Sequence, residues 1–582
     1  MPSEQVRKWW KEATCYQIWP ASFQDSNDDG CGDIPGIISR LDYLKELGID
    51  LIWLSPVYDS PQHDMGYDIA SYEDIWPKYG TLKDMEQLIM EVKMRDMKII
   101  MDLVVNHTSN EHIWFKESAK TKDEDNHYRN WYHWRDPKGF DADGKPIAPN
   151  NWRAAFGGSV WTYVEARKQF YLHLGLPEQP DLNWFNSRTR SAIFDSAIEF
   201  WLKRGIDGFR VDVVNFYWKD LTFPDSVVTN PGELYQPMEA QYIVNGPLMH
   251  DWLQEQRREA LDKYGDVVLV GELPATSGEE ILQYLSPENR ELDMILDFDI
   301  FMAGNSWNAL PHEMRKPKLT ELKSAFCKTQ GLINGGWPTT FLESHDNSRS
   351  IDRFGPGADS VHRVAAARML ALLVTTLSGT LYIYQGQEIG MTNMPKTWAK
   401  EDLRDKAIIN YLADIERKYP GDAEWKQRAH DAALRLGRDN ARTPVQWSSD
   451  AHAGFTRGEP WIAVNDNYRT MNAKDQEGKD DSVLEFWRSM LRKRKQLVDT
   501  LVYGRFELLD EQNEEKLSFV KSSDAGDRIY VELNWSNDEQ ALLTLPATQN
   551  SSRKFLMSSH PDATTDEVSR ALRPWEGRAY II

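Results

Sequence analysis

Short apolar segments alternate with segments of helical periodicity over most of the chain. In the helical segments, apolar residues recur at intervals of three and four, and the apolar segments between them are typical of buried strands. Eight strands separated by helices predict an α/β fold, a (β/α)8 TIM barrel. The predicted strands are Tyr16–Trp19, Leu51–Leu54, Ile99–Val105, Gly208–Val211, Val267–Val270, Met294–Phe298, Thr340–Leu342 and Thr380–Tyr384. The helical segments include Ile38–Leu47, Leu82–Arg95, Thr189–Arg204 and Gly246–Tyr264.

Two stretches depart from this alternation and predict further domains. Residues 106–180, after the third strand, are rich in Trp, Asp, Gly and Pro and lack helical periodicity, which indicates an inserted subdomain B over the barrel mouth. From residue 501 to 582 the pattern favours a C-terminal antiparallel β-domain. The barrel itself is then expected in two parts, residues 1–105 and 181–500. The expected C-terminal strands are Phe506–Leu509, Leu517–Val520, Arg528–Leu533, Ala541–Leu545 and Arg578–Ile582.

Composition narrows the classes of partner and the compartment. The 582 residues carry a net charge of −22, which argues against nucleic acid because phosphate binding needs clustered cations. Three cysteines are too few for a disulfide framework and fit a reducing compartment. No secretory signal and no apolar run of about 20 residues is visible, so we expect a cytoplasmic protein with no membrane partner. The oligomeric state cannot be predicted from these features.

Polar residues gather directly after several predicted strands, where the working residues of a (β/α)8 barrel lie. An isolated Asp at a strand end most often only caps the next helix. Four clusters around one barrel instead indicate an active site. The clusters are Asp102-Leu-Val-Val-Asn106-His107, Gly208-Phe-Arg210-Val-Asp212, Val270-Gly271-Glu272 and Glu343-Ser-His345-Asp346-Asn347.

With these clusters in place, the sequence resembles the α-amylase superfamily, glycoside hydrolase family 13, over nearly the whole chain. Within it, the chain is similar to the oligo-1,6-glucosidase and maltase/isomaltase group. The resemblance implies an exo-acting retaining α-glucosidase that acts on short oligosaccharides and needs no catalytic cofactor. The supporting segments are Cys15-Tyr-Gln-Ile-Trp-Pro20, Gln179-Pro-Asp-Leu-Asn183, Gln385-Gly-Gln-Glu-Ile-Gly390 and Arg438-Asp-Asn-Ala-Arg-Thr-Pro-Val-Gln-Trp447.

The resemblance implies that Asp212 is the nucleophile, Glu272 the general acid/base and Asp346 the transition-state stabiliser. Retention needs one ionised carboxylate at the anomeric carbon and one protonated carboxyl beside the leaving oxygen, about 5–5.5 Å apart. Arg210 stands two residues before Asp212 on the same strand face and is placed to lower its pKa. Partial burial among other carboxylates is expected to raise the pKa of Glu272.

The histidines of the clusters are suited to donate hydrogen bonds to sugar hydroxyls. His107 and His345 could strengthen their hydrogen bonds to glucose in the transition state. A metal site is disfavoured because no third ligand stands at zinc-like spacing. The resemblance adds His112, in Asn110-Glu-His-Ile-Trp-Phe115, as a further sugar contact.

The resemblance also implies a pocket that is closed behind one glucose. Asp64 and Tyr67 are similar to residues that recognise and stack against the terminal sugar, and Phe156 to part of the pocket wall. Arg438 and Arg442 are both candidates for the cation that pairs with Asp64. A closed end leaves room for one glucose beyond the cleaved bond, hence exo action.

An acidic loop near the N-terminus predicts a structural cation. Oxygen ligands stand at alternate positions with a Gly after the third, as at the start of an EF-hand loop, although Gly36 takes the place of the bidentate Glu. The alternative is a surface turn that Asp, Asn and Gly form by themselves. Because the group often carries a structural ion here, we expect Ca²⁺, with Mg²⁺ as the other choice. The predicted ligands are Asp25, Asn27, Asp29, Cys31 and Asp33.

The linkage preference is expected to follow the residue after the nucleophile. In this group Val goes with α-1,6 bonds and Thr with α-1,4 bonds, so Val213 favours isomaltose-type substrates, with maltose and sucrose left open. One such contact is worth only about 1–3 kcal/mol of discrimination. His63 and Asn347 depart from the commoner family residues and could alter acceptor choice, including transglycosylation.

Two alternatives share the fold. A sucrose isomerase has the same three carboxylates, but its Arg-rich aglycone signature is not evident in Ser350-Ile-Asp-Arg-Phe354. A non-catalytic relative, such as the ectodomain of an amino-acid transporter heavy chain, bears a membrane anchor and commonly loses catalytic carboxylates. The presence of all three carboxylates favours the enzyme.

Overall fold

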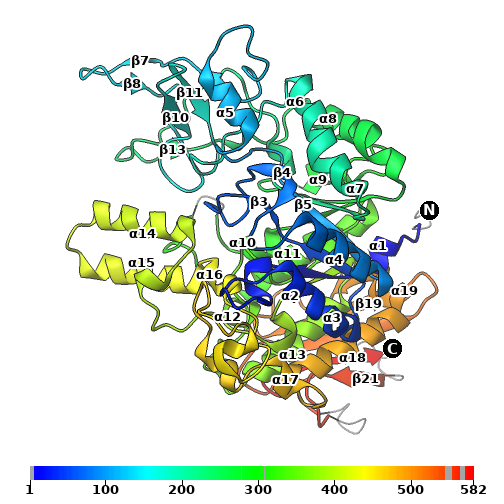
Figure 1. Ribbon diagram of the computed structural model, residues 1–582. Helices are drawn as coiled ribbons and strands as arrows, with labels where there is room; N and C mark the ends of the chain where they lie inside the picture. The colour runs from blue at the N-terminus through cyan, green and yellow to red at the C-terminus, as the bar shows by residue number, and fades with distance from the viewer. Residues whose placement is uncertain (1–5, 277, 307–308, 544–552, 564–569) are drawn as a thin grey trace.

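Eight parallel strands form the central barrel of the computed structural model, which describes residues 6–276, 278–306, 309–543, 553–563 and 570–582 (Figure 1). Neighbours in the chain are neighbours in the sheet, in the order β15-β14-β12-β5-β2-β1-β17-β16. A parallel bridge between Ile295 and Pro338 joins the two edge strands and closes the ring. The predicted barrel is confirmed. Its strands are β1 (Thr14–Ile18), β2 (Leu51–Leu54), β5 (Lys98–Leu103), β12 (Gly208–Val211), β14 (Val268–Glu272), β15 (Met294–Leu296), β16 (Thr339–Thr340) and β17 (Thr380–Tyr384).

Helices surround the barrel and bury its outer face. Every residue of β2, β12 and β17 is buried, as expected for parallel strands that are covered on both sides. Threonine 81 and Asp84 form a reciprocal capping box at the start of α4. The longer helices are α2 (Ile34–Ser39), α3 (Leu41–Leu47), α4 (Leu82–Met94), α6 (Ser187–Ile193), α8 (Met249–Gln256), α9 (Gly278–Leu285), α11 (Leu319–Gly331), α13 (Arg363–Thr376) and α18 (Val483–Gln496).

Two of the predicted helices are interrupted by π turns. The segment predicted as Thr189–Arg204 contains η2 (Phe194–Glu199), and the one predicted as Gly246–Tyr264 contains η5 (Arg257–Leu261). A π turn contains one more residue than an ordinary α-helical turn. The spacing of apolar residues by three and four in the sequence does not reveal this extra residue.

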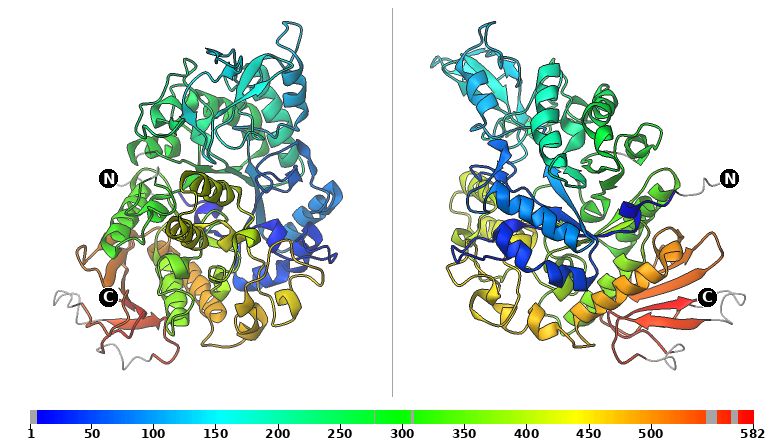
Figure 2. Two further views of the ribbon diagram at one scale, coloured as in Figure 1. Left: turned by 90° about the vertical axis from the view of Figure 1, so that its left-hand side faces the viewer. Right: turned by 45° about the vertical axis from the view of Figure 1, so that its right-hand side comes forward.

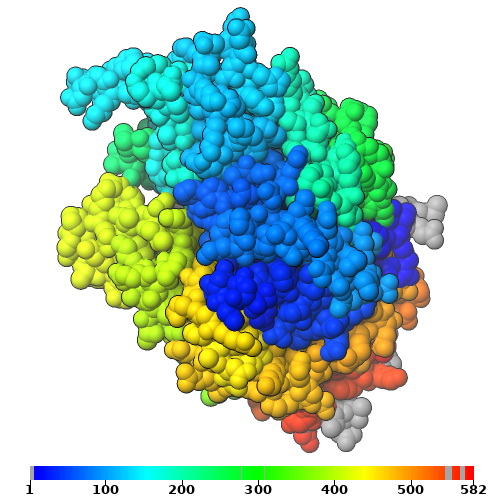
Figure 3. Space-filling view, in the orientation of Figure 1, coloured from blue at the N-terminus to red at the C-terminus, as the bar shows by residue number. Residues whose placement is uncertain are grey.

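The segment after β5 forms a separate layer above the barrel (Figure 1). Its antiparallel sheet has the order β10-β11-β6, and the β7–β8 hairpin projects from the surface (Figure 3). The hairpin of α14 (Lys406–Lys418) and α15 (Ala423–Leu436) projects on the same side of the view. The elements of the insertion are α5 (Ile113–Lys120), β6 (Trp134–Arg135), β7 (Gly139–Phe140), β8 (Pro146–Ile147), β9 (Trp152–Arg153), β10 (Trp161–Val164) and β11 (Gln169–Leu172).

The chain ends in an antiparallel sheet of order β18-β19-β20-β22-β21, which lies beside α18 (Figure 2). The predicted strand Ala541–Leu545 is wrong for residues 541–543, because the N–H of Leu543 donates to the Glu532 side chain and not to a strand; residues 544–545 lie outside the described residues. The fifth strand is β21 instead. The strands are β18 (Arg505–Leu508), β19 (Lys516–Ser522), β20 (Arg528–Asn534), β21 (Lys554–Ser558) and β22 (Gly577–Ile581).

Among the described residues, no helix is both long enough and apolar enough to cross a bilayer. The longest apolar helix, α13, is instead buried within the protein against α18 and the C-terminal sheet.

Candidate active site

The barrel brings the four predicted clusters to one end. Asp102 lies in β5 and pairs in register with Arg210 of β12, which in turn pairs with Val270 of β14. Glu272 is the last residue of β14, and Asp212 directly follows β12. Because neighbouring parallel strands end at the same edge, their polar side chains converge there.

Arg210 is the centre of this convergence. Its guanidinium is 1% exposed and holds three carboxylates. Nη1 donates to Asp102 Oδ1 and to Asp212 Oδ1, both at 2.7 Å, and Nη2 donates to Glu272 Oε2 at 2.6 Å. The planar fork of an arginine fixes the positions of its partners. Asp212 and Glu272 therefore face one common space and do not point apart.

The two carboxyls that share Arg210 differ in proton affinity. Burial raises the pKa of Glu272 to about 8; Arg210 opposes this, while the charges of Asp212 and Asp346 add to it. Burial also raises the pKa of Asp212, to about 6, against the effect of Arg210. Arg210 thus lowers the pKa of Asp212 as predicted, but burial outweighs it. The pair loses its protons in two steps, and the proton retained longer belongs to the Glu272 side.

Asp346 stays ionised at all ordinary pH values. It lies in the loop after β16, with its side chain 30% exposed. Burial would raise its pKa, but His345, Arg438 and Arg442 together lower the pKa to about 2. The nearest contacts of Asp346 Oδ1 are Arg442 Nη2 at 3.4 Å and Arg438 Nη1 at 3.6 Å. A permanent negative charge therefore stands beside Arg438 and Arg442.

His345 is held by aromatic and polar neighbours. Its ring stacks on Tyr67 with centroids 5.2 Å apart and an interplanar angle of 6°, and Trp19 stacks on it at 5.3 Å. Its Nδ1 lies 2.7 Å from Gln17 Nε2, and its Nε2 lies 2.7 Å from the Tyr67 hydroxyl. Burial lowers the pKa of His345 to about 3, so the ring is neutral. The structure brings Tyr67 and His345 together with Asp346, as the sequence predicted.

An ion pair joins two distant segments of the chain beside Asp346. Asp64 Oδ1 lies 3.1 Å from Arg438 Nη2, which is also 2.8 Å from Asp405 Oδ1. Arg442 contacts Asp346 and the His345 carbonyl instead. Of the two candidate arginines, Arg438 is therefore the partner of Asp64.

Two more predicted residues lie near this ion pair. The ring centroid of Phe156 lies 5.3 Å from the Arg438 guanidinium carbon. Gln179 donates to Asp64 Oδ2 at 3.2 Å and to the Tyr67 carbonyl. His107 Nε2 lies 2.9 Å from that same carbonyl. His107 thus belongs to the site.

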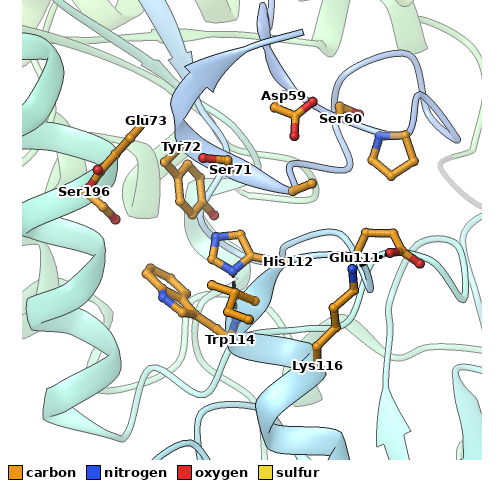
Figure 4. Close-up of a pocket in the computed structure, with 13 residues that line it drawn as sticks. Asp59, Ser60, Ser71, Tyr72, Glu73, Glu111, His112, Trp114, Lys116 and Ser196 are labelled. Atoms are coloured by element: carbon orange, nitrogen blue, oxygen red, sulfur yellow. Dashed lines mark hydrogen bonds and ion pairs between the residues drawn. The ribbon is translucent and has the colours of Figure 1, made fainter.

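His112 is not brought to the carboxylates. It caps α5 through a hydrogen bond from the Trp114 N–H to its Nδ1, and its ring packs against Tyr72 and Trp114 (Figure 4). The adjacent cavity has a volume of about 730 Å³. Over the described residues, its lining includes Asp59 and Glu111 but none of the three carboxylates named above. The contacts of His112 are those of a helix cap.

Val213 forms a strained turn between the two carboxyls. Its φ of 35° and ψ of 47° lie in the left-handed region, which a β-branched residue rarely adopts. The turn aims its N–H at Glu272 Oε2, at 3.1 Å. Glu272 therefore has a second fixed donor beside Arg210. Strain of this kind persists only where the surrounding structure holds it.

Sequence reasoning missed several residues of the site. Asp405 begins α14 far from any recognisable motif, and only the fold shows that it pairs with Arg438. Trp53 donates from Nε1 to Asp102 Oδ2 at 2.8 Å. Gln17 follows Tyr16 within the first predicted strand, and its polar side chain in a buried run was the one available signal.

The acidic loop near the N-terminus is held by its own hydrogen bonds. The carboxylate of Asp25 accepts from backbone N–H groups of the loop and from the Thr456 hydroxyl. Asp33 caps α2 through the N–H of Gly36. Among the described residues, no three His, Cys, Asp or Glu side chains are grouped to hold a metal. The ion proposed for the loop stays a prediction.

Known proteins are similar to the chain in sequence over nearly their whole length. Residues 17–504 match the catalytic domain of alpha amylase. The chain is 44% identical to an alpha-glucosidase from Candida albicans, covering 99% of both proteins. It is 43% identical to an oligo-1,6-glucosidase from Saccharomyces cerevisiae, covering 99% of this chain and 98% of that protein.

The fold is also similar to that of a solved structure. An isomaltulose synthase mutant from Erwinia rhapontici in complex with sucrose superimposes with a TM-score of 0.90 at 34% identity, covering 99% of this chain and 100% of the other. The family match spans well over half of the chain, and the relatives match it nearly from end to end. The chain belongs to the α-amylase family of glycoside hydrolases.

Proposed function

We propose that the protein is an exo-acting, retaining α-glucosidase that removes terminal α-linked glucose from short oligosaccharides. One observation carries the proposal. Asp212 and Glu272 share the Arg210 guanidinium, and the nearby Asp346 contacts the Asp64–Arg438 ion pair. Two carboxyls of different proton affinity on one sugar-sized space are what retaining hydrolysis needs.

The reaction proceeds in two displacements. The Asp212 carboxylate attacks the anomeric carbon as the bond to the glycosidic oxygen breaks, and Glu272 gives its proton to that oxygen. The leaving sugar departs. Glu272, now ionised, takes a proton from water, whose oxygen attacks the same carbon and releases Asp212. Asp346 stabilises the positive charge that develops on the ring, and a second sugar in place of water would give transglycosylation.

A substrate panel tests the proposal. We expect glucose release from isomaltose, maltose and p-nitrophenyl α-glucoside, with the α-anomer formed first. Release of long internal fragments from starch would contradict the closed pocket. On sucrose, formation of isomaltulose in place of glucose and fructose would favour the isomerase, since the fold is also similar to that of an isomaltulose synthase. Undiminished activity of Asp212→Ala would favour a non-catalytic relative with a contaminating activity.

Removing the arginine that closes the pocket should weaken substrate use strongly. In Arg438→Met, Asp64 and Asp405 lose their cation, and the end of the pocket is no longer fixed. We expect kcat/KM for isomaltose to fall by about 100-fold, the usual effect of losing a charged hydrogen bond in a buried site. The control is Arg435→Met, at an exposed arginine three residues away that donates to backbone carbonyls, with a change below about twofold. Equal effects in both variants would contradict the assignment of Arg438.

The pH dependence should have two limbs. Protonation of Asp212 removes the nucleophile as pH falls through about 6. Loss of the Glu272 proton removes the acid as pH rises through about 8. A plot of kcat/KM against pH should therefore be bell-shaped, with its maximum between these values. A single-limbed profile would show that one of the two groups does not titrate in the free enzyme.

The linkage preference is proposed to depend on Val213. In Val213→Thr the backbone strain is unchanged, since both residues are β-branched, but a hydroxyl appears beside the second sugar. We expect the ratio of kcat/KM for isomaltose to that for maltose to fall by about tenfold. Val213→Ile, which adds no hydroxyl, should keep the preference. An unchanged ratio in Val213→Thr would show that linkage is set elsewhere.

A structural Ca²⁺ ion in the loop of residues 25–33 is proposed separately from catalysis. The loop offers oxygen atoms from Asp25, Asn27 and Asp29, while its hydrogen bonds already satisfy part of them. No step of the reaction runs through the ion. Metal analysis of the purified protein checks this expectation.

A further inference from the structure

A buried lysine is linked to His107 through Asn106. Lys219 is fully buried, in the segment after β12, and its ammonium makes three contacts. They are the Asp181 Oδ2 at 2.6 Å, the Asn106 Oδ1 at 2.7 Å and the Phe216 carbonyl at 2.6 Å. An ammonium has three protons, so each has an acceptor and the charge is satisfied without water.

The contacts of Lys219 settle the orientation of Asn106. An ammonium can only donate, so the atom of Asn106 that faces it is the carbonyl oxygen. The amide nitrogen of Asn106 then points the other way, to Asp181 Oδ2 at 3.2 Å and His107 Nδ1 at 3.3 Å. Asp181 accepts there, in agreement with this orientation.

The orientation of Asn106 in turn determines which ring nitrogen of His107 carries the proton. An amide N–H₂ can only donate, so His107 Nδ1 is an acceptor without a proton. Burial lowers the pKa of His107, and the neutral ring carries its proton on Nε2. Nε2 lies 2.9 Å from the Tyr67 carbonyl, which can only accept. Gln179 Nε2, at 3.3 Å from His107 Nε2, gives its protons to Asp64 and Tyr67 and does not compete.

We propose that Lys219, acting through Asn106, is a positioning residue that keeps His107 Nε2 a hydrogen-bond donor to the Tyr67 carbonyl and so holds Tyr67 in its stack on His345. The inference rests on the proposed function, in which Tyr67 stacks against the terminal glucose. Lys219 touches neither the three carboxylates nor the pocket wall. It also joins three segments, since Asn106 lies after β5, Asp181 lies after β11 and Lys219 lies after β12.

The tautomer of His107 can be determined in the absence of substrate. Selective ¹⁵N labelling of histidine and long-range ¹H–¹⁵N spectra distinguish the protonated ring nitrogen, and His107→Gln identifies the signal. We expect wild-type His107 to be neutral with its proton on Nε2. Asn106→Asp has the same shape but can only accept, so the proton should move to Nδ1. Lys219→Met frees the Asn106 amide to turn, and both tautomers should appear.

The kinetic result should follow the spectra. We expect kcat/KM for isomaltose to fall by about 10- to 100-fold in Asn106→Asp and Lys219→Met, because Tyr67 loses a buried hydrogen bond that holds it in the site. The matched control is Lys323→Met, at a lysine of α11 that is equally buried, against the Asp510 side chain and the backbone carbonyls of Asp510 and Asn513. It should lose similar stability with the tautomer and kcat/KM unchanged.

Several results would overturn the inference. One such result is a wild-type His107 that carries its proton on Nδ1 or on both ring nitrogens. This result would overturn the inference by itself, even if the variants failed to fold. Retention of the Nε2 proton in both variants, or a changed tautomer with unchanged kcat/KM, would also do so. If instead no α-glucoside is hydrolysed, the proposed function fails while the spectra still report the Lys219 to His107 chain.

Discussion

Asp212→Ala is expected to lose activity on isomaltose by about 10⁴-fold or more, because the covalent intermediate can no longer form. The fold should survive. Arg210 keeps Asp102 and Glu272 as partners, so that Nη1 and Nη2 each still have an acceptor. Steady-state kinetics with isomaltose and with p-nitrophenyl α-glucoside, together with a thermal melt, measure the two effects separately.

A small anion provides the sharpest form of this test. In Asp212→Ala, azide can enter the space of the missing carboxylate and attack the anomeric carbon from that side. The nitrophenolate leaves and the product is the β-glucosyl azide, formed by a single inversion. The matched control is Asp297→Ala, a buried Asp that follows β15 and bonds to Thr329 but not to Arg210. It should lose stability and less than about tenfold in activity, and similar losses in both variants would contradict the role of Asp212.

The barrel could be predicted because its strands are buried on both faces. Such strands read as unbroken apolar runs between polar ends, and the bounds of β2, β12 and β17 agree with those predicted from the sequence. The failed prediction at residues 541–543 has the opposite cause. Alternating polarity is a local pattern, and it does not tell whether a backbone N–H will meet a neighbouring strand or a side chain such as Glu532.

The site could be predicted as a set of residues but not as a set of pairs. Each cluster stands at a strand end, and the fold class alone says that strand ends meet. The partner of Asp64 is 374 residues away, and no local pattern chooses between Arg438 and Arg442. The same holds for Asp405, which carries no motif.

The direction of the pKa shift of Asp212 was also not predicted correctly from its neighbours in the sequence. The contact between Arg210 and Asp212 was foreseen, and it does lower the pKa of Asp212. Burial is a collective property of the closed barrel end, and it raises the same pKa by more. The sign of the net shift therefore depends on the whole fold and not on the nearest charge.

Glu272→Gln is expected to separate substrates by how much they need an acid. The amide oxygen can still accept from Arg210 and from the Val213 N–H, so the geometry should be kept. Isomaltose, whose leaving sugar must be protonated, should lose about 10³-fold in kcat/KM. p-Nitrophenyl α-glucoside, whose phenolate leaves unaided, should keep a much faster first step and show a burst of nitrophenol, because the second step lacks its base.

The same variant predicts its own pH profile and azide product. With Glu272 gone, the alkaline limb of the profile should disappear, while the acid limb from Asp212 remains. Azide should attack the glucosyl-enzyme intermediate where water normally does, and the second inversion gives the α-glucosyl azide. Asp212→Ala gives the β-anomer from the same reagents. If both variants gave the same anomer, or if the alkaline limb persisted in Glu272→Gln, the two carboxyls would not lie on opposite sides of the anomeric carbon with separate tasks, and the retaining mechanism would be wrong.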